Sequence, residues 1–271
     1  MLAATRFDTD RRLDAVVVDG NHVMHLIASV DANGVHAGPL GVRATQQLPR
    51  AAELVVATNV ANDLFGEVVV VLAPEAGQTT RATSVWRVLR ANETGVPSFA
   101  TPVFVTSFPT RVVSLVASNL SGRYRNNLDR RKWLIAGTDD GRVLAARSNQ
   151  SVAEPLSGVP DAPGGEVQLL VADFTNDNIP DLVGNVRGSR QLFLFRNQPD
   201  VSAPWRFPLP GSYQFQGTGL FDSPVVISLP EAVGDLAAAR VDNDVLQDIL
   251  ALSADGQRVH VVLTRGSQQG F

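Results

Sequence analysis

Acidic side chains recur at alternate positions of one short segment, and this spacing could hold a metal ion. Asp173, Thr175, Asp177 and Asp181 occupy positions 1, 3, 5 and 9 of a loop, and the Ile179 carbonyl is available at position 7. Calcium takes six to eight oxygen ligands, and alternate loop positions can converge on one ion. The alternative is that these side chains only cap the turn by accepting hydrogen bonds from backbone amides. We predict one calcium site here, because three converging carboxylates repel one another unless a cation lies between them.

Two related loops keep the acidic positions 3, 5 and 9 but begin with an arginine, Arg6 or Arg240. Their carboxylates belong to Asp8, Asp10 and Asp14 in the first loop and to Asp242, Asp244 and Asp248 in the second. A guanidinium can fill the space between carboxylates and form a charge-assisted network without a metal. The alternative is that the arginine points to solvent and calcium binds weakly. We favour the metal-free interpretation, and we expect no calcium at the carboxylate-poor loops near Asn59 and Asn119.

The segments that must position these loops have the pattern of short β-strands. Valine- and leucine-rich runs such as 15–18, 68–71 and 192–195 alternate with clusters of Gly, Asn and Asp, and helical periodicity is nearly absent. Runs of four to eight β-branched or aromatic residues between such clusters are typical of strands. Many short strands without helices predict an all-β fold.

One unit, strand–acidic loop–strand, recurs along the whole chain. Its copies lie near residues 6–14, 59–67, 119–132, 173–181 and 240–248. The apolar second position of the loop repeats with spacings of 53, 60, 54 and 67 residues. A period of about 55 residues that holds roughly four short strands matches one β-propeller blade, and a single blade cannot bury both faces of its sheet. We therefore predict a β-propeller of about five four-stranded blades as a single domain over residues 1–271, or alternatively part of a seven-bladed propeller.

The last copy has sequence for only three strands. The chain starts with the strand at 2–7, which belongs to the first copy, and it ends with the strand at 259–263 and a short tail. Most propellers pair strands from both termini in one blade, which removes an exposed edge. We expect instead a three-stranded last blade, in a five-bladed ring closed by face packing alone or in an excised part of a larger propeller.

The loop at 173–181, Asp-Phe-Thr-Asn-Asp-Asn-Ile-Pro-Asp, resembles the FG-GAP/VCBS repeat of integrin α-chain propellers and related bacterial surface proteins. The run at 178–182 is also similar to T-cell immunomodulatory protein (Linkin)-like members. The Phe-Gly and Gly-Ala-Pro flanks of that repeat are missing, and Asn178 stands where its sixth-position glycine is expected. The resemblance implies a propeller with calcium in its loops that acts in adhesion, ligand recognition or assembly, at the cell surface or outside the cell.

Two segments interrupt the repeat and are candidates for contact with a partner. The first is a basic stretch that contains Tyr124, Arg125, Arg130 and Arg131. The second, 197–223, is rich in aromatic residues, among them Trp205, Phe207, Tyr213, Phe215 and Phe221. Aromatic and arginine side chains are the usual anchors of recognition surfaces. The alternatives are that the first segment is a solvated insertion and that the second covers the rim of the fold.

Composition excludes several classes of function. A net charge of −4 and an isoelectric point near 5.6 argue against nucleic acid as a partner. The absence of cysteine excludes thiolate metal sites and cysteine nucleophiles. No apolar run approaches the roughly 20 residues of a membrane helix, and no nucleophile elbow or phosphate-binding loop is present. The sequence therefore predicts a non-catalytic scaffold for protein–protein or cell-surface interactions, with a carbohydrate-binding lectin as the alternative.

Overall fold

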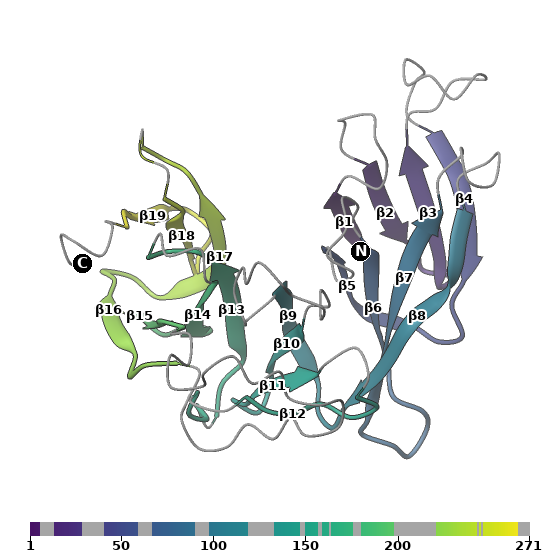
Figure 1. Cartoon of the computed structure of the whole chain (residues 1–271), viewed down its shortest axis with the longest axis horizontal. Helices are drawn as coiled ribbons and strands as arrows, with labels where there is room; N and C mark the ends of the chain where they lie inside the picture. The colour runs from purple at the N-terminus through teal and green to yellow at the C-terminus, as the bar shows by residue number, and fades with distance from the viewer. Residues whose placement is uncertain are drawn as a thin grey trace, which may run out of the picture. The chain divides into compact units, whose positions relative to one another are not determined.

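The computed structural model describes residues 1–5, 14–28, 41–58, 67–89, 98–118, 133–146, 150–156, 159–162, 164–175, 180–197, 221–242, 244 and 246–264. Every regular element within these residues is a β-strand, and the strands form five antiparallel sheets (Figure 1). The predicted all-β fold class with five blade-like sheets is confirmed. The prediction of one domain over residues 1–271 stays a prediction.

The first three sheets follow one another along the chain. The first contains β1 (Leu2–Thr5), β2 (Asp14–Val18), β3 (Val23–Ala28) and β4 (Gly41–Gln47). The second contains β5 (Ala52–Thr58), β6 (Glu67–Leu72), β7 (Arg81–Leu89) and β8 (Ser98–Phe108). The third contains β9 (Val112–Ser118), β10 (Trp133–Thr138), β11 (Val143–Ala146) and β12 (Glu154–Pro155). In each sheet spatial neighbours are also sequence neighbours, which is the meander topology of a propeller blade.

The fourth and fifth sheets have the same meander order. The fourth contains β13 (Val167–Ala172), β14 (Asp181–Val186), β15 (Gln191–Phe195) and β16 (Val225–Ser228). The fifth contains β17 (Val233–Ala239), β18 (Asp248–Ser253) and β19 (Val259–Val262), so it has three strands within the described residues, as predicted. The first strand, β1, pairs antiparallel with β2 in the first sheet, with Leu2 opposite Val17. This pairing agrees with the prediction that the N-terminal strand does not complete the fifth sheet.

The chain divides into two compact units. One unit holds the first and second sheets, the other holds the fourth and fifth, and the strands of the third sheet are shared between them. Each unit is described by itself below.

Alternating side chains give each sheet two faces, which we name from the second strand. The A face carries the third residue of that strand, for example Val16 in β2, and the B face carries its second residue, for example Val68 in β6. In the first unit, Val16 and Leu26 of the first sheet belong to one buried cluster with Val68 and Val70 of the second. The A face of the first sheet therefore packs on the B face of the second.

The second unit repeats this arrangement. Val183 and Leu194, from the A face of the fourth sheet, belong to one buried cluster with Ile249 and Ala251, from the B face of the fifth. All four side chains are fully buried. The side-chain amide of Gln168 also donates a hydrogen bond of 2.6 Å to the carbonyl of Gly234, which joins the two sheets at their first strands. Packing of an A face on a B face is thus the rule in both units.

Candidate functional site

A buried acidic residue opens the second strand of four sheets. Asp14, Glu67, Asp181 and Asp248 begin β2, β6, β14 and β18, and each is at most 2% exposed. Buried carboxylates are rare unless several donors satisfy them. These residues occupy the ninth position of the repeated loops. Asp181 is one of the predicted calcium ligands, and Asp14 and Asp248 are predicted carboxylates of the two arginine-led loops.

Asp181 joins the loop before it to the segment after the third strand. One carboxylate oxygen accepts the backbone N–H of Phe174, and the other accepts the backbone N–H of Asn197, both at 3.0 Å. The side-chain amide of Asn197 then donates to the carbonyl of Pro180 at 3.0 Å. We call this arrangement the carboxylate clip. It closes the end of the sheet through one buried side chain that uses both of its oxygens.

Asp248 forms the same clip in the fifth sheet. Its two oxygens accept the backbone N–H groups of Val241 and Thr264 at 2.9 and 3.0 Å. The hydroxyl of Thr264 donates to the carbonyl of Gln247 at 2.7 Å. The donors lie seven residues before and sixteen residues after the aspartate in both sheets, so the clip is a property of the repeat unit.

The predicted calcium loop is described only in part. Asp177 and Ile179 lie outside the described residues, and Asp173 is half-buried next to the end of β13. Thr175 is 8% exposed, and its hydroxyl has no hydrogen-bond partner within the part of the chain that the structure describes. A hydroxyl oxygen is a ligand that calcium accepts. The described members of the set are therefore compatible with the ion, although Asp181 already bonds two amides.

The loop of the fifth repeat caps its own turn. One carboxylate oxygen of Asp242 accepts the backbone N–H of Asp244 at 2.9 Å, and one of Asp244 accepts the N–H of Leu246 at 2.8 Å. Arg240 is exposed, and each of the three carboxylates near it accepts at least one backbone amide. This is the turn-capping arrangement that is the alternative to calcium for the loop at 173–181.

The remaining predicted site residues are placed as follows. Arg6, Asp8 and Asp10 lie outside the described residues. So do the partner-contact candidates Tyr124, Arg125, Arg130, Arg131, Trp205, Phe207, Tyr213 and Phe215. Phe221 is the described member of the aromatic segment. It is 6% exposed, and its ring meets that of Phe195 edge-on at a centroid distance of 6.4 Å, so it belongs to the packing of the fourth sheet.

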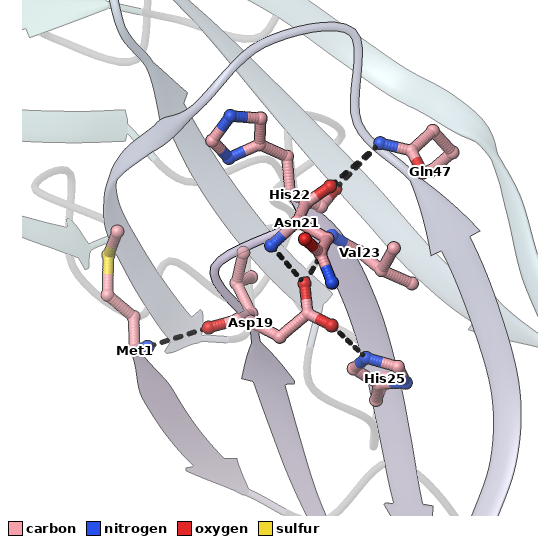
Figure 2. A network of polar contacts seen from close by, with 8 residues as sticks. Met1, Asp19, Asn21, His22, Val23, His25 and Gln47 are labelled. Carbon is pink, nitrogen blue, oxygen red and sulfur yellow. Dashed lines mark hydrogen bonds and ion pairs between the residues drawn. The ribbon is translucent and has the colours of Figure 1, made fainter.

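The opposite end of the sheets, at the turns between second and third strands, carries polar clusters that sequence reasoning missed. In the first sheet, one oxygen of Asp19 accepts the backbone N–H groups of Asn21 and Val23, both at 2.9 Å (Figure 2). The other lies 3.1 Å from Nε2 of His25, a cross-strand neighbour of Val17. These contacts lower the pKa of Asp19, and the hydrogen bond from the Val23 amide is the largest cause.

The third sheet has a related turn. The hydroxyl of Thr138 donates to Asp140 and accepts the backbone N–H of Arg142 at 2.9 Å. The Arg142 guanidinium in turn donates to the other oxygen of Asp140, which lowers the pKa of that carboxyl to about 2. Ser253 and Asp255 repeat the hydroxyl–carboxylate pair at the β18–β19 turn. A hydroxyl followed two residues later by aspartate is the sequence signal that would have predicted these turns.

Beside that turn, Glu231 pairs with Arg258 and lies 3.3 Å from Nε2 of His260. Asp19, Asp140 and Glu231 are thus each paired with a histidine or an arginine. Each of these sheets therefore has polar side chains at its turn between the second and third strands. Within the described residues, no three acidic or histidine side chains converge as a metal site would require.

The A face of the fifth sheet carries three exposed apolar side chains in a row. Val259, Val261 and Leu263 alternate along one side of β19 and its extension, and they are 57%, 45% and 46% exposed. The register places Leu252 opposite Val259 and Leu250 opposite Val261, so the same face continues across β18. Contiguous exposed apolar side chains of this kind mark interaction sites.

Comparison with known proteins assigns no family to this chain. No protein-family profile matches the sequence, and no curated protein is similar to it. The solved structures with a similar chain path include the Dos1 propeller, which is 12% identical with a TM-score of 0.43, over 97% of this chain and 58% of that one. This chain therefore spans little more than half the length of the Dos1 propeller chain.

Two other solved structures are similar at the same distant level. An Agrocybe aegerita lectin, described as recognising non-reducing terminal N-acetylglucosamine, is 12% identical with a TM-score of 0.46, over 97% of this chain and 80% of that one. The Pseudomonas aeruginosa periplasmic gluconolactonase PpgL is 14% identical with a TM-score of 0.41, over 100% of this chain and 83% of that one. These distant likenesses concern the path of the chain alone. Among the described residues there is no helix with the length and apolarity to span a bilayer.

Proposed function

We propose that this chain is a non-catalytic scaffold of the β-propeller type that works by binding another protein through the A face of its fifth sheet. The observation that carries the proposal is the exposure of Val259, Val261 and Leu263 on that face. In the fourth sheet, Leu192 is equivalent to Val259 and Leu194 to Val261, and both leucines are fully buried. Exposing these apolar side chains to water forgoes free energy of about 25 cal/mol for each Å² that a partner would cover.

The repeat supports the propeller part of the proposal. Sheets of blade topology stack with the A face of one on the B face of the next, and this happens independently in both units. A stack in which every junction is equivalent continues until it closes on itself or meets a partner.

Calcium, adhesion and an extracellular or cell-surface location belong to the proposal as well. They are supported by the resemblance of the loop at 173–181 to the FG-GAP/VCBS repeat. The buried hydroxyl of Thr175 adds support from the fold, because it lies in the same loop as Asp173 without a hydrogen-bond partner among the described residues. Calcium would then stabilise one loop of the scaffold and take no part in chemistry.

Site-specific crosslinking tests the proposal. A photoreactive amino acid is placed at position 259 of the full chain, produced in cells of its natural source, and a second version carries it at 152. Val152 is the matched control, since it is 53% exposed but lies outside the sheet faces. We expect a discrete protein adduct from position 259 and none from position 152. Equal adducts from both positions, or none from either, would refute the proposal.

A further inference from the structure

Three turns between the second and third strands of their sheets contain the dipeptide Asp-Gly, at residues 19–20, 140–141 and 255–256. This dipeptide is open to a spontaneous reaction, because glycine has no side chain to hinder an approach to its backbone nitrogen. That nitrogen attacks the side-chain carboxyl carbon of the aspartate, and one water molecule leaves as a succinimide ring closes. Water then opens the ring at the main-chain carbonyl. The product is isoaspartate, in which the backbone runs through the former side chain.

The turn between β10 and β11 requires both residues of its dipeptide. Gly141 has a φ of 92°, in the left-handed region that favours glycine. One oxygen of Asp140 accepts the hydroxyl of Thr138 at 2.6 Å, and the other accepts two N–H groups of Arg142 at 2.9 and 2.6 Å. Exchange of either residue would cost the turn its backbone conformation or these contacts. The reactive dipeptide is therefore imposed by the fold.

The contacts of Asp140 oppose both requirements of the reaction. The carboxyl carbon must rotate toward the glycine nitrogen, and Thr138 and Arg142 hold both carboxylate oxygens in place. The carboxyl must also be protonated, because water leaves from it far more easily than an oxide would. The hydrogen bond from Arg142 is the largest cause that lowers the pKa of Asp140 to about 2. At about pH 5, this pKa in place of 3.8 makes the protonated fraction about 60-fold smaller.

The other two Asp-Gly turns are natural comparisons. Asp255 accepts the hydroxyl of Ser253 and the backbone N–H of Gln257. Asp19 accepts backbone N–H groups and lies beside His25. Neither of these two carboxylates pairs with an arginine in the part of the chain that the structure describes. The guanidinium contact is thus particular to Asp140.

We propose that Arg142, together with Thr138, protects the Asp140–Gly141 bond from conversion to isoaspartate. The conversion would add one carbon atom to the main chain within the turn. It would displace the hydrogen bonds from the N–H of Thr138 to the carbonyl of Arg142, 3.1 Å, and from the N–H of Ala162 to the carbonyl of Gly141, 2.7 Å. Arg142 therefore preserves the turn over the lifetime of the protein. This role is independent of the binding function proposed above.

The rate of isomerisation in the purified full chain tests this role. Wild type, Arg142→Gln and Arg142→Lys are incubated at about pH 5, and mass spectrometry with electron-transfer fragmentation measures isoaspartate at all three dipeptides of each sample. We expect Arg142→Gln to raise the rate at Asp140 by about tenfold or more, because the carboxyl regains freedom and its ordinary pKa. The rates at Asp19 and Asp255 should not change, and these residues serve as controls within the same molecule. Arg142→Lys keeps a cation and should raise the rate at Asp140 less.

Two further measurements separate protection from other effects. Thermal unfolding checks that each variant is folded during the incubation. In urea the contacts of the turn are lost, so wild type and Arg142→Gln should react equally fast at Asp140. The inference is overturned if Arg142→Gln leaves the rate at Asp140 unchanged or raises the rate equally at all three dipeptides. It is also overturned if the two chains still differ in urea, because the effect would then belong to the local sequence and not to the fold.

Discussion

Replacing Asp181 by asparagine tests whether the ninth loop position serves the fold or a metal. Both oxygens of Asp181 accept buried backbone N–H groups, those of Phe174 and Asn197. A hydrogen bond to a charged acceptor contributes roughly 1.5–3 kcal/mol, and a buried donor left without a partner costs a similar amount. Asparagine keeps one acceptor oxygen but replaces the other with an NH₂ group. That group is itself a donor, so it cannot accept the second backbone N–H. We therefore expect Asp181→Asn to lower the free energy of unfolding by about 2–4 kcal/mol.

Urea unfolding in calcium and in a chelator measures this loss. Amide hydrogen bonds do not depend on calcium, so the clip predicts the same loss in both conditions, whereas a metal ligand predicts a loss in calcium alone. Asp248→Asn should cost about the same, because its two hydrogen bonds have equivalent geometry. Asp244→Asn is the control. It accepts one part-buried amide, that of Leu246, through a single oxygen, and the oxygen of asparagine can accept the same N–H, so we expect a loss below about 1 kcal/mol.

The reasoning fails if Asp181→Asn costs less than about 1 kcal/mol, the net worth of an ordinary hydrogen bond, or if its effect appears only when calcium is present. The second result would make Asp181 a calcium ligand first and a backbone clip second. If Asp181→Asn loses much free energy of unfolding and Asp248→Asn loses little, the two clips share their geometry but differ in how much they stabilise the fold.

Further predictions concern the calcium loop, a charged turn and a close contact. Asp177→Ala should lower the melting temperature in calcium and leave it nearly unchanged in chelator; equal destabilisation in both would exclude a metal role. Asp140 should titrate by NMR near pH 2 and its pKa should return toward 3.8 in Arg142→Gln. Because its pKa is lowered on folding, its contribution is present above pH 3.8 and lost toward pH 2, and solvent screening limits it to about 1 kcal/mol. Gly137→Ala should cost roughly 3 kcal/mol, because its Cβ would collide with a backbone carbonyl of β13, whereas Gly20→Ala, in open space, should cost under about 1 kcal/mol.

The number and order of the sheets were predictable because each copy of the repeat consists of strand-forming runs separated by turn residues. The acidic loops fall between the first and second strands of their sheets, and their spacing gave one sheet per copy. That the described residues of the fifth sheet form three strands was also predictable, since it depends only on how many strand-like runs follow the last loop.

The carboxylate clip was not predictable from residue types. Its donors are backbone amides, which every non-proline residue has, and one of them lies sixteen residues away across two strands. Besides the aspartates, only Asn197 and Thr264 contribute side chains to the clips, so only these could be recognised in the sequence. Asparagine and threonine are too common after strands to serve as a signal. The exposure of Val259 was equally invisible, because alternation defines two faces but does not say which one a neighbour covers.

The clip also changes which residues count as a sign of calcium. An acid at the ninth loop position has a structural task whether or not a metal is present, since Asp181 and Asp248 bond the same pair of amides in loops of different composition. Asp14 and Glu67, the first residues of β2 and β6, are nearly as buried as Asp181 and Asp248. The third sheet differs, because its second strand begins with Trp133. A carboxylate at the start of the second strand is therefore evidence for the blade. The evidence for the ion lies in the earlier positions of the loop, where Asp173 has no counterpart in the arginine-led copies and where the buried hydroxyl of Thr175 requires a partner.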